Sequence, residues 1–411
     1  MSRFRDYNEE KDKESVRRIW RETGWLEEGK EENMDRFIQA SREALVADID
    51  GEAECLVLTA PGTIKYQDEE LPFSGVTAVT TSRVARKQGF AGKLSALAVA
   101  KSAANGACVS GLGMFEQGFY NKLGYGTGSY DHWLAFDPAT LKIDMKPRVP
   151  KRITSEDWEK VYESRKNRMK DHGNITLLTP KGTKAEMDIV KNSFGLGYFD
   201  GPDGGLTHHI YFGVKSVERG PYWVMWMAYQ NYDQYRELLG LMKNLGDQVR
   251  LIHMPEPHDI QLQDLIDKPF KRRQITEKSK FEHKMTATAW WQMRILDLER
   301  CIERTHLKGD DVKFNLELED PIERLFDDDA PWKGISGEYI VTFGEDSTVE
   351  KGRDPDLPTL EASVGAFTRM WLGVRPATGL AVTDKLVGPD ELLEDLDEVL
   401  NLPRPLIGWD I

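Results

Sequence analysis

The stretch that most constrains the fold is a run of β-branched residues that leads through a basic turn into an alanine-rich run. Residues 75–82 are GVTAVTTS, residues 83–92 are RVARKQGFAG, and alanines recur from Gly89 to about Asn105. β-Branched residues favour strands, whereas alanine favours helices. The order therefore predicts a strand, a turn and a helix, and the small side chains let the helix pack closely on a sheet.

The turn has the composition of an anion-binding site. The first four N–H groups of a helix have no internal partner, and the helix dipole makes that end positive. Gly89 lets the backbone approach a ligand without a Cβ atom in the way. Arg86, Lys87 and Lys93 add charge, so a pyrophosphate would fit. A solvated basic turn ahead of an ordinary helix fits the same residues, and the turn alone does not decide between the two.

Composition limits the class of protein. The chain has 411 residues, which indicates two or three domains. Its formal net charge of −14 argues against nucleic acid as a partner and favours small polyamines or basic peptides. We expect no membrane partner, because no apolar run is long enough to span a bilayer.

The N-terminus and the cysteines predict a cytoplasmic protein. The first residues, MSRFRDYNEEKDKE, lack the apolar core of a secretion signal. Cys55, Cys108 and Cys301 are odd in number and far apart, which argues against a disulfide framework. His208-His209 has no acid or cysteine at ligand spacing, so we expect no metal site. Residues 327–329, three aspartates, are expected to form a loop.

The rest of the chain predicts α/β and then α+β organisation. Asp50-Gly51 joins two strand-like runs and is a strong hairpin signal. A strand is expected at 107–112 and a half-buried one at 130–137. A proline- and lysine-rich linker follows, then a second strand–helix unit with a buried strand at 222–229 and an amphipathic helix at 231–249. The pattern of expected elements changes again near residue 284, where antiparallel strands followed by helices are expected.

A second motif follows the strand after the alanine-rich run. Residues 118–126 are GFYNKLGYG. The order R-x-x-G-x-A, helix, strand and F-Y-x-K-x-G-Y-G resembles the GNAT acetyltransferase superfamily. In that superfamily the glycine loop binds the pyrophosphate of acetyl-CoA, and the tyrosine of the second motif often acts as a general acid. The last position of the loop is Ala91 here.

Over the whole chain the sequence resembles the Eis (enhanced intracellular survival) family, including the entry WWQMRILDLERCIE into its last domain. The resemblance implies two tandem GNAT-type acyl-CoA N-acyltransferase domains followed by a sterol-carrier-protein-like α+β domain. The implied boundaries are 1–140, 147–283 and 284–411, with the C-terminal tail reaching the active site. It also implies a homo-oligomer, a hexamer, that acetylates amines such as aminoglycosides and lysine side chains.

The resemblance assigns roles residue by residue. Backbone groups of one stretch would pair with the pantetheine arm of acetyl-CoA, the glycine loop would hold its pyrophosphate, and two further residues would touch the cofactor after the next strand. Phe115 stands where the family has a small polar residue. The cofactor-binding residues so implied are Val79, Thr80, Thr81, Arg86, Lys87, Gln88, Gly89, Phe90, Ala91, Gly92, Phe115 and Glu116.

Tyr120 matches the family's general acid, and the C-terminal carboxylate, here that of Ile411, matches its base. Glu116 is the rival base. Each assignment has a plain alternative, because Tyr120 also fits a core aromatic and Ile411 also fits a frayed chain end. The ending LPRPLIGWDI is apolar and stiffened by proline, which favours docking. Trp25 and Asp410 could line an amine pocket or simply lie at the surface.

The sequence thus predicts an acetyl-CoA-dependent N-acetyltransferase that acts on a primary amine of aminoglycoside, polyamine or lysine type by direct transfer. An amine must lose a proton, held to a pKa of about 10, before it attacks a thioester. Two alternatives stay open: a protein-lysine acetyltransferase, and a non-catalytic acyl-CoA or lipid carrier. The many acids in the last domain's strands make a wide lipid tunnel a poorer fit.

Overall fold

The computed structural model describes residues 3–190, 192–326, 330 and 332–411, which leaves the predicted loop at 327–329 outside the described residues. The chain forms two compact units. The first unit comprises residues 1–129, 171–179 and 290–411, and the second unit comprises residues 130–170 and 180–289.

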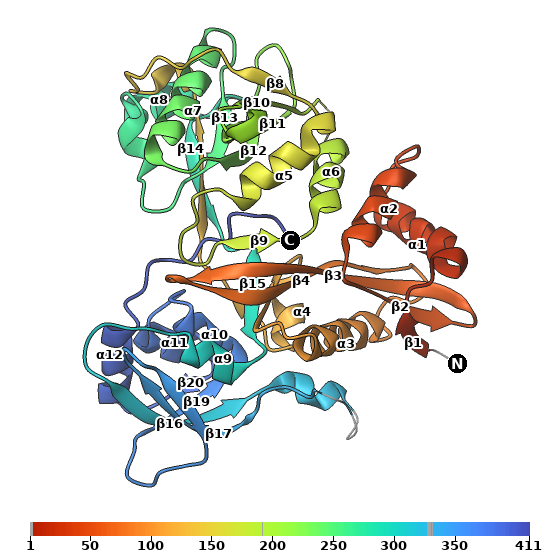
Figure 1. The fold of residues 1–411 in the computed structure, drawn as a ribbon, viewed down its shortest axis with the longest axis vertical. Helices are drawn as coiled ribbons and strands as arrows, with labels where there is room; N and C mark the ends of the chain where they lie inside the picture. Colours follow the sequence, from red (N-terminus) through yellow and green to blue (C-terminus); the bar gives the residue numbers. More distant parts are fainter. Residues whose placement is uncertain (1–2, 191, 327–329, 331) are drawn as a thin grey trace. The chain divides into compact units, whose positions relative to one another are not determined.

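The main sheet of the first unit has the strand order β1-β2-β3-β4-β5-β15-β6, with β9 paired to β3 (Figure 1). Among the strand pairs of the described residues in this sheet, β4 and β5 run parallel and the others are antiparallel. Its strands are β1 (Arg3–Asp6), β2 (Glu43–Ile49), β3 (Glu52–Tyr66), β4 (Glu69–Thr81), β5 (Val109–Gly113), β6 (Gly126–Thr127), β9 (Ile175–Leu177) and β15 (Trp291–Ile295). The predicted hairpin at Asp50-Gly51 is confirmed as the turn between β2 and β3.

Helices cover both faces of this sheet because side chains of successive strand residues alternate between them. Val46 and Leu56 pack with α1, whereas Leu45 and Val57 pack with α3. The helix predicted after the glycine turn is confirmed as α3. The helices of this layer are α1 (Glu9–Thr23), α2 (Glu31–Ala40), α3 (Phe90–Ala104) and α4 (Gln117–Asn121).

β4 carries a bulge, and its pairing with β5 is short. Thr77 pairs with Leu58 but Thr80 pairs with Leu56, so β4 has one extra residue between them. β5 pairs with β4 only at residues 73–75. Within the described chain, β4 therefore continues past Gly75 without a strand partner on its β5 side.

The sheet of the second unit repeats this design, with the order β8-β10-β11-β12-β13-β7-β14. Its only parallel pair is β12 with β13, and β12 has one extra residue between Val224 and Trp226. Its strands are β7 (Asp131–Phe136), β8 (Lys151–Ile153), β10 (Phe194–Tyr198), β11 (His208–Val214), β12 (Tyr222–Ala228), β13 (Ile252–Pro255) and β14 (Lys284–Thr288). Its helices are α5 (Trp158–Lys166), α6 (Pro180–Ile189), α7 (Tyr232–Asn244) and α8 (Pro269–Thr276).

One strand of each sheet comes from an unexpected part of the chain. β7 follows β6 in sequence but lies between β13 and β14, and β15 follows β14 but lies between β5 and β6. The sheets thus divide the chain near residues 130 and 289. The domain boundaries 1–140, 147–283 and 284–411 stay predictions. The strand pairing divides the chain at other positions, because a strand joins the sheet that satisfies its backbone hydrogen bonds.

The rest of the first unit is a five-stranded sheet of order β18-β17-β16-β19-β20 with helices packed on it. Arg294 of β15 forms a fully buried ion pair with Asp320 at its border. The strands are β16 (Val312–Glu319), β17 (Gly337–Phe343), β18 (Thr348–Lys351), β19 (Thr359–Ser363) and β20 (Leu386–Val387). The helices are α9 (Leu298–Glu303), α10 (Val364–Trp371), α11 (Ala377–Thr383) and α12 (Asp390–Val399).

None of the helices in the described ranges is both long and apolar enough to cross a bilayer. The described residues also contain no group of three or more His, Cys, Asp or Glu placed to hold a metal ion. Cys55, Cys108 and Cys301 are buried as free thiols.

Candidate active site

The N-terminus of α3 is open. Gly89 is its N-cap with φ +84°, a left-handed conformation that residues with a Cβ rarely adopt, and it makes no side-chain cap. A Cβ on Gly89 or Gly92 would meet nothing within 4 Å, so space is free beside both. The first turn has no acidic residue to offset the helix dipole. This end of α3 can bind a phosphate through backbone N–H groups.

The turn before α3 adds positive charge. Arg86, Lys87 and Gln88 are exposed, and Lys87 also has a positive φ of 62°. The Gln88 side chain donates to the Val84 carbonyl at 2.8 Å, which braces the turn. Two further predicted loop residues, Ala91 and Gly92, are half-buried in the first turn of α3 with Phe90. The predicted loop residues therefore lie together around one helix end.

The predicted stretch 79–81 forms the end of β4. Thr80 and Thr81 pair with β3 on one side, and the other side has no strand partner in the described chain. The Thr80 hydroxyl accepts a hydrogen bond from the Trp20 indole at 3.2 Å. Trp20 makes an edge contact with Trp25, whose ring is 53% exposed. Trp25 is thus connected to Thr80 of β4 through Trp20.

Ile411, the last residue of the chain, lies where β4 and β5 stop pairing. An ideal Cβ on Gly75 of β4 would stand 2.7 Å from Cγ2 of Ile411. One on Gly113, at the end of β5, would stand 3.2 Å from a carboxylate oxygen of Ile411. Trp409 is buried and Asp410 is exposed, so the tail is docked through every second side chain. The chain end is held in place instead of frayed.

Tyr120 lies in α4 with its side chain in the core beside α3. Its ring packs edge-on against Phe119 and Tyr125, and only 4% of the residue is exposed. Burial raises the pKa of Tyr120 to about 12, so its hydroxyl stays protonated at neutral pH. Glu116 and Phe115, just before α4, are exposed, Phe115 to 88%. Neither side chain is fixed by packing in the way that Tyr120 is.

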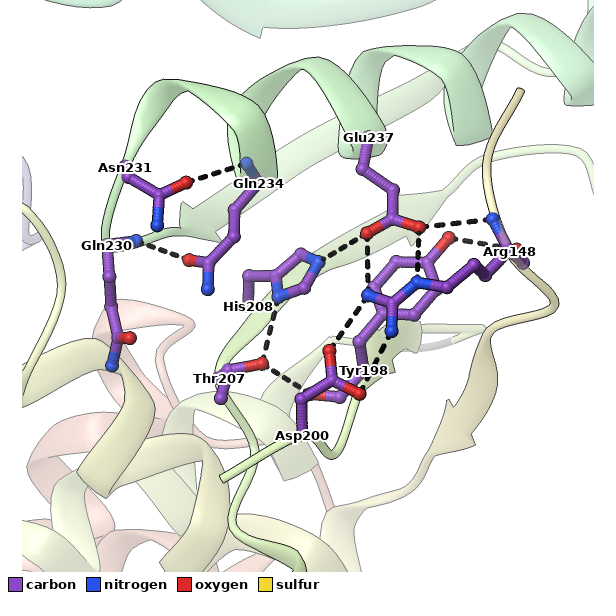
Figure 2. A network of polar contacts seen from close by, with 9 residues as sticks. All are labelled: Arg148, Tyr198, Asp200, Thr207, His208, Gln230, Asn231, Gln234 and Glu237. Atoms are coloured by element: carbon purple, nitrogen blue, oxygen red, sulfur yellow. Dashed lines mark hydrogen bonds and ion pairs between the residues drawn. The ribbon is translucent and has the colours of Figure 1, made fainter. Parts of the chain in front are cut away.

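The corresponding helix of the second unit, α7, has a closed N-terminus. Asn231 caps it by accepting from the Gln234 N–H at 3.0 Å, and Gln234 in turn accepts from the Gln230 N–H at 2.7 Å (Figure 2). Its first turn contains Asp233, which offsets the dipole. Only residues 229–231 separate β12 from α7. At this helix end the Gln234 N–H is already bonded and Asp233 adds negative charge, so the end is less favourable to a phosphate than that of α3.

Beyond that cap, α7 carries a polar network. Glu237 accepts hydrogen bonds from His208 at 3.0 Å and from Arg148 at 2.7 Å, and Arg148 also pairs with Asp200 (Figure 2). Arg148 lowers the pKa of Glu237 to about 2, while burial lowers the pKa of His208. Every polar group there has a partner within the network, which points to a structural role.

A cavity of about 490 Å³ also lies in the second unit, between the loops at the end of β7 and the start of β13. Three arginines and three acids line it, together with buried His283, whose Nε2 accepts from the Asp137 N–H. None of the predicted site residues lines this cavity. The chemistry implied by the sequence therefore has its residues in the first unit.

Several residues around the candidate site have no counterpart among the residues predicted from the sequence. Gly75 and Gly113 contact the chain end, and Trp20 reaches Thr80. Segment 171–179 makes backbone hydrogen bonds with the tail at Leu406 and Ile407. No local pattern marks these residues, because each contact joins parts of the chain that are far apart in sequence.

Residues 4–128 match a family model described as an acetyltransferase (GNAT) domain. No curated protein matches the sequence. Among solved structures, the fold is similar to a probable N-acyltransferase of unknown function from Enterococcus faecalis, with 17% identity and a TM-score of 0.79. It is also similar to a GCN5-related N-acetyltransferase from Anabaena variabilis (14% identity, TM-score 0.80) and to Eis1 from Mycobacterium abscessus (16% identity, TM-score 0.75). Each likeness covers 100% of both chains, and the fold is that of tandem GNAT domains.

Proposed function

We propose that the chain is an N-acetyltransferase that acetylates primary amines by direct transfer, because residues 4–128 match a GNAT acetyltransferase domain, whose acyl donor is acetyl-CoA. One observation carries the proposal: β4 leads into a helix with an open N-terminus, and the terminal carboxylate lies where β4 and β5 stop pairing. The net charge of −14 favours a cationic acceptor of aminoglycoside, polyamine or lysine type.

The described residues fit acetyl-CoA. The backbone of residues 89–92 and the side chains of Arg86 and Lys87 would hold the pyrophosphate, since this helix end is uncapped and roomy. The unpaired edge of residues 79–81 would accept the pantetheine arm as an added strand. When bound, acetyl-CoA supplies an activated acetyl group.

The carboxylate of Ile411 would hold the ammonium form of the acceptor and take its proton. Free amines keep that proton to a pKa of about 10, so a base or a water relay is needed at neutral pH. The carboxylate oxygen beside Gly113 is fixed by the docked tail. A fixed base costs little entropy at the moment of reaction. Asp410, exposed beside it, would add negative charge that attracts the amine.

Tyr120 would donate its hydroxyl proton toward the leaving sulfur. With a pKa of about 12, the Tyr120 hydroxyl remains protonated across the physiological range. Complete transfer to a sulfur with a pKa of about 8.5 would be uphill, so Tyr120 assists mainly by a hydrogen bond that strengthens as charge develops.

Further features remain proposals that rest on the likeness to Eis proteins. These are the sterol-carrier-like nature of residues 284–411, a hexameric assembly, cytoplasmic location, and contacts of Phe115, Glu116 and Trp25 with ligands. The mixed five-stranded sheet with helices packed on it is consistent with the first of these.

The test is to add four glycines after Ile411. We expect thiol release from acetyl-CoA with a polyamine acceptor to be abolished, because the carboxylate is removed from its seat, while coenzyme A binding and the melting temperature are unchanged. The same four residues added at the N-terminus serve as the control. Full activity in the C-terminally extended enzyme would transfer the role of base to Glu116 or to water.

A further inference from the structure

The tail that ends at Ile411 is held by a short segment that comes from the middle of the chain. The Ile175 N–H donates to the Ile407 carbonyl at 2.9 Å, and the Leu406 N–H donates to the His172 carbonyl. The Asn174 side chain donates from Nδ2 to the Leu406 carbonyl at 2.6 Å. Figure 1 shows the C-terminus beside β9. The tail thus adds to the free edge of β9 over a few residues.

Sterically, the fit is closest at Gly173. This residue has φ +83°, and a Cβ on it would stand 2.5 Å from the Pro405 Cβ and 2.8 Å from the Pro405 Cα. Both the backbone angle and the missing side chain are therefore needed there. The Ser129 hydroxyl donates to the carbonyl of the same Pro405. Pro405 therefore contacts both Gly173 and Ser129 of the first unit.

The segment is itself fixed on its other edge. β9 pairs with β3, and the Lys65 N–H donates to the Asn174 carbonyl at 2.8 Å. The Gln67 N–H donates to Nδ1 of His172, which leaves the His172 proton on Nε2, where it reaches the Leu372 carbonyl at 3.0 Å. The tip of the β3–β4 hairpin thus holds the segment, and the segment holds the tail.

We propose that residues 172–175 form a clasp that positions the terminal carboxylate, with Gly173 and Asn174 as its positioning residues. The inference rests on the function proposed above. Chain ends usually fray, so a carboxylate at a chain end needs a second strand to hold it. A displacement of about 1 Å can cost roughly a hundredfold in rate, so loosening the clasp should lower turnover without touching the cofactor site.

The clasp also has an unusual place in the chain. Residues 170 and 180, on either side of it, belong to the second unit, whereas the clasp belongs to the first. The clasp is therefore a short part of the first unit that stands, in sequence, between two segments of the second unit.

The experiment measures the tail directly. Carboxypeptidase is added to the full-length protein, and release of Ile411 is followed by intact mass. We expect slow release from the wild type and release at least tenfold faster from Gly173→Ala. Asn174→Asp, which keeps the oxygen that accepts from the Asp171 N–H but loses the donor to Leu406, should also be faster. Gly204→Ala is the control, because Gly204 has φ +72° but a Cβ on it would meet nothing within 4 Å.

Kinetics of the same variants give the second readout. We expect kcat to fall about tenfold or more with an unchanged KM for acetyl-CoA, and sodium formate to restore part of the lost kcat. A merely structural role would not give rescue by a small carboxylate.

The outcomes separate the two proposals. Equal release of Ile411 from wild type, Gly173→Ala and Asn174→Asp would overturn the clasp. Faster release with unchanged kcat would keep the clasp as a holder of the tail but remove the carboxylate from the chemistry. Should Gly173→Ala not fold, Asn174→Asp decides alone, since it adds no atom at the contact with Pro405.

Discussion

The strand–helix–strand motifs β4–α3–β5 of the first unit and β12–α7–β13 of the second unit share their topology but differ at the N-terminus of the helix. Both have a parallel strand pair and a bulged first strand, and both helices pack on their sheets. α3 begins at an uncapped glycine after a long basic turn, whereas α7 begins at a capping asparagine after a short connection. The shared topology therefore does not by itself make a helix N-terminus suitable for an anion. The helix cap and the preceding loop determine whether the N-terminus is open.

The largest effect is expected at Tyr120 of the first unit, the proposed proton donor. Tyr120→Phe should lower turnover by roughly two orders of magnitude or more, the usual size for loss of a proton donor, with cofactor affinity unchanged. Tyr235→Phe in α7 is the matched control, because the Tyr235 hydroxyl is buried with no hydrogen-bond partner in the described chain. Steady-state thiol release measures both variants, and equal rates would remove Tyr120 from the mechanism.

The helix ends are tested next by giving α3 the acid that α7 has. Gly89→Asp places a carboxylate at the open end, adds a Cβ at φ +84° and repels phosphate. We expect coenzyme A affinity to fall by about 2 kcal/mol, or roughly thirtyfold. Calorimetry should also give one coenzyme A per chain in the wild type. Two sites per chain, or an unaltered affinity, would contradict the contrast between the helices.

The network on α7 should matter for stability and not for binding. Glu237→Gln should lower the free energy of unfolding by about 1.5 kcal/mol at pH 7, because Glu237 accepts charged hydrogen bonds while Arg148 remains half exposed. The pKa of Glu237 is about 2 in the fold and 4.5 as a free side chain. Its contribution is therefore present above about pH 4.5 and is lost as the pH falls toward 2.

Denaturant unfolding between pH 7 and pH 3 measures this difference. The gap in unfolding free energy between wild type and Glu237→Gln should narrow on acidification. Glu218→Gln is the control and should leave stability unaffected, because Glu218 only forms an exposed ion pair with Arg219. A gap that stays constant with pH would mean that folding does not shift the pKa of Glu237.

The smallest effect concerns the cap of α7. Asn231→Ala removes the acceptor for the Gln234 N–H and should cost about 1 kcal/mol of unfolding free energy. Coenzyme A stoichiometry should not change, since Asp233 still offsets the dipole and the connection remains short. If this variant gained a second coenzyme A site, the cap alone would be what separates the two helices.

Local signals predicted the elements of the proposed cofactor site. The β-branched run, the basic glycine turn and the alanine-rich run became β4, the turn and α3, and Asp50-Gly51 became a hairpin. These features depend on residues adjacent in sequence, where backbone preferences are strong. The strand at 130–137 was also predicted, but the sheet to which it belongs was not. Alternation of apolar and polar residues indicates a half-buried strand, but it does not indicate which strands pair with it.

The sequence by itself determined the strand, turn and helix that form the open end of α3, since Gly89 and its neighbours act through their own backbone angles and charges. Only the tertiary structure determined where the C-terminal residue, Ile411, lies in the fold. The seat of Ile411 is built by Gly75, Gly113 and a clasp at Gly173, residues far apart in sequence. Such contacts arise from packing and strand pairing over long distances, and no local preference encodes which partners will meet.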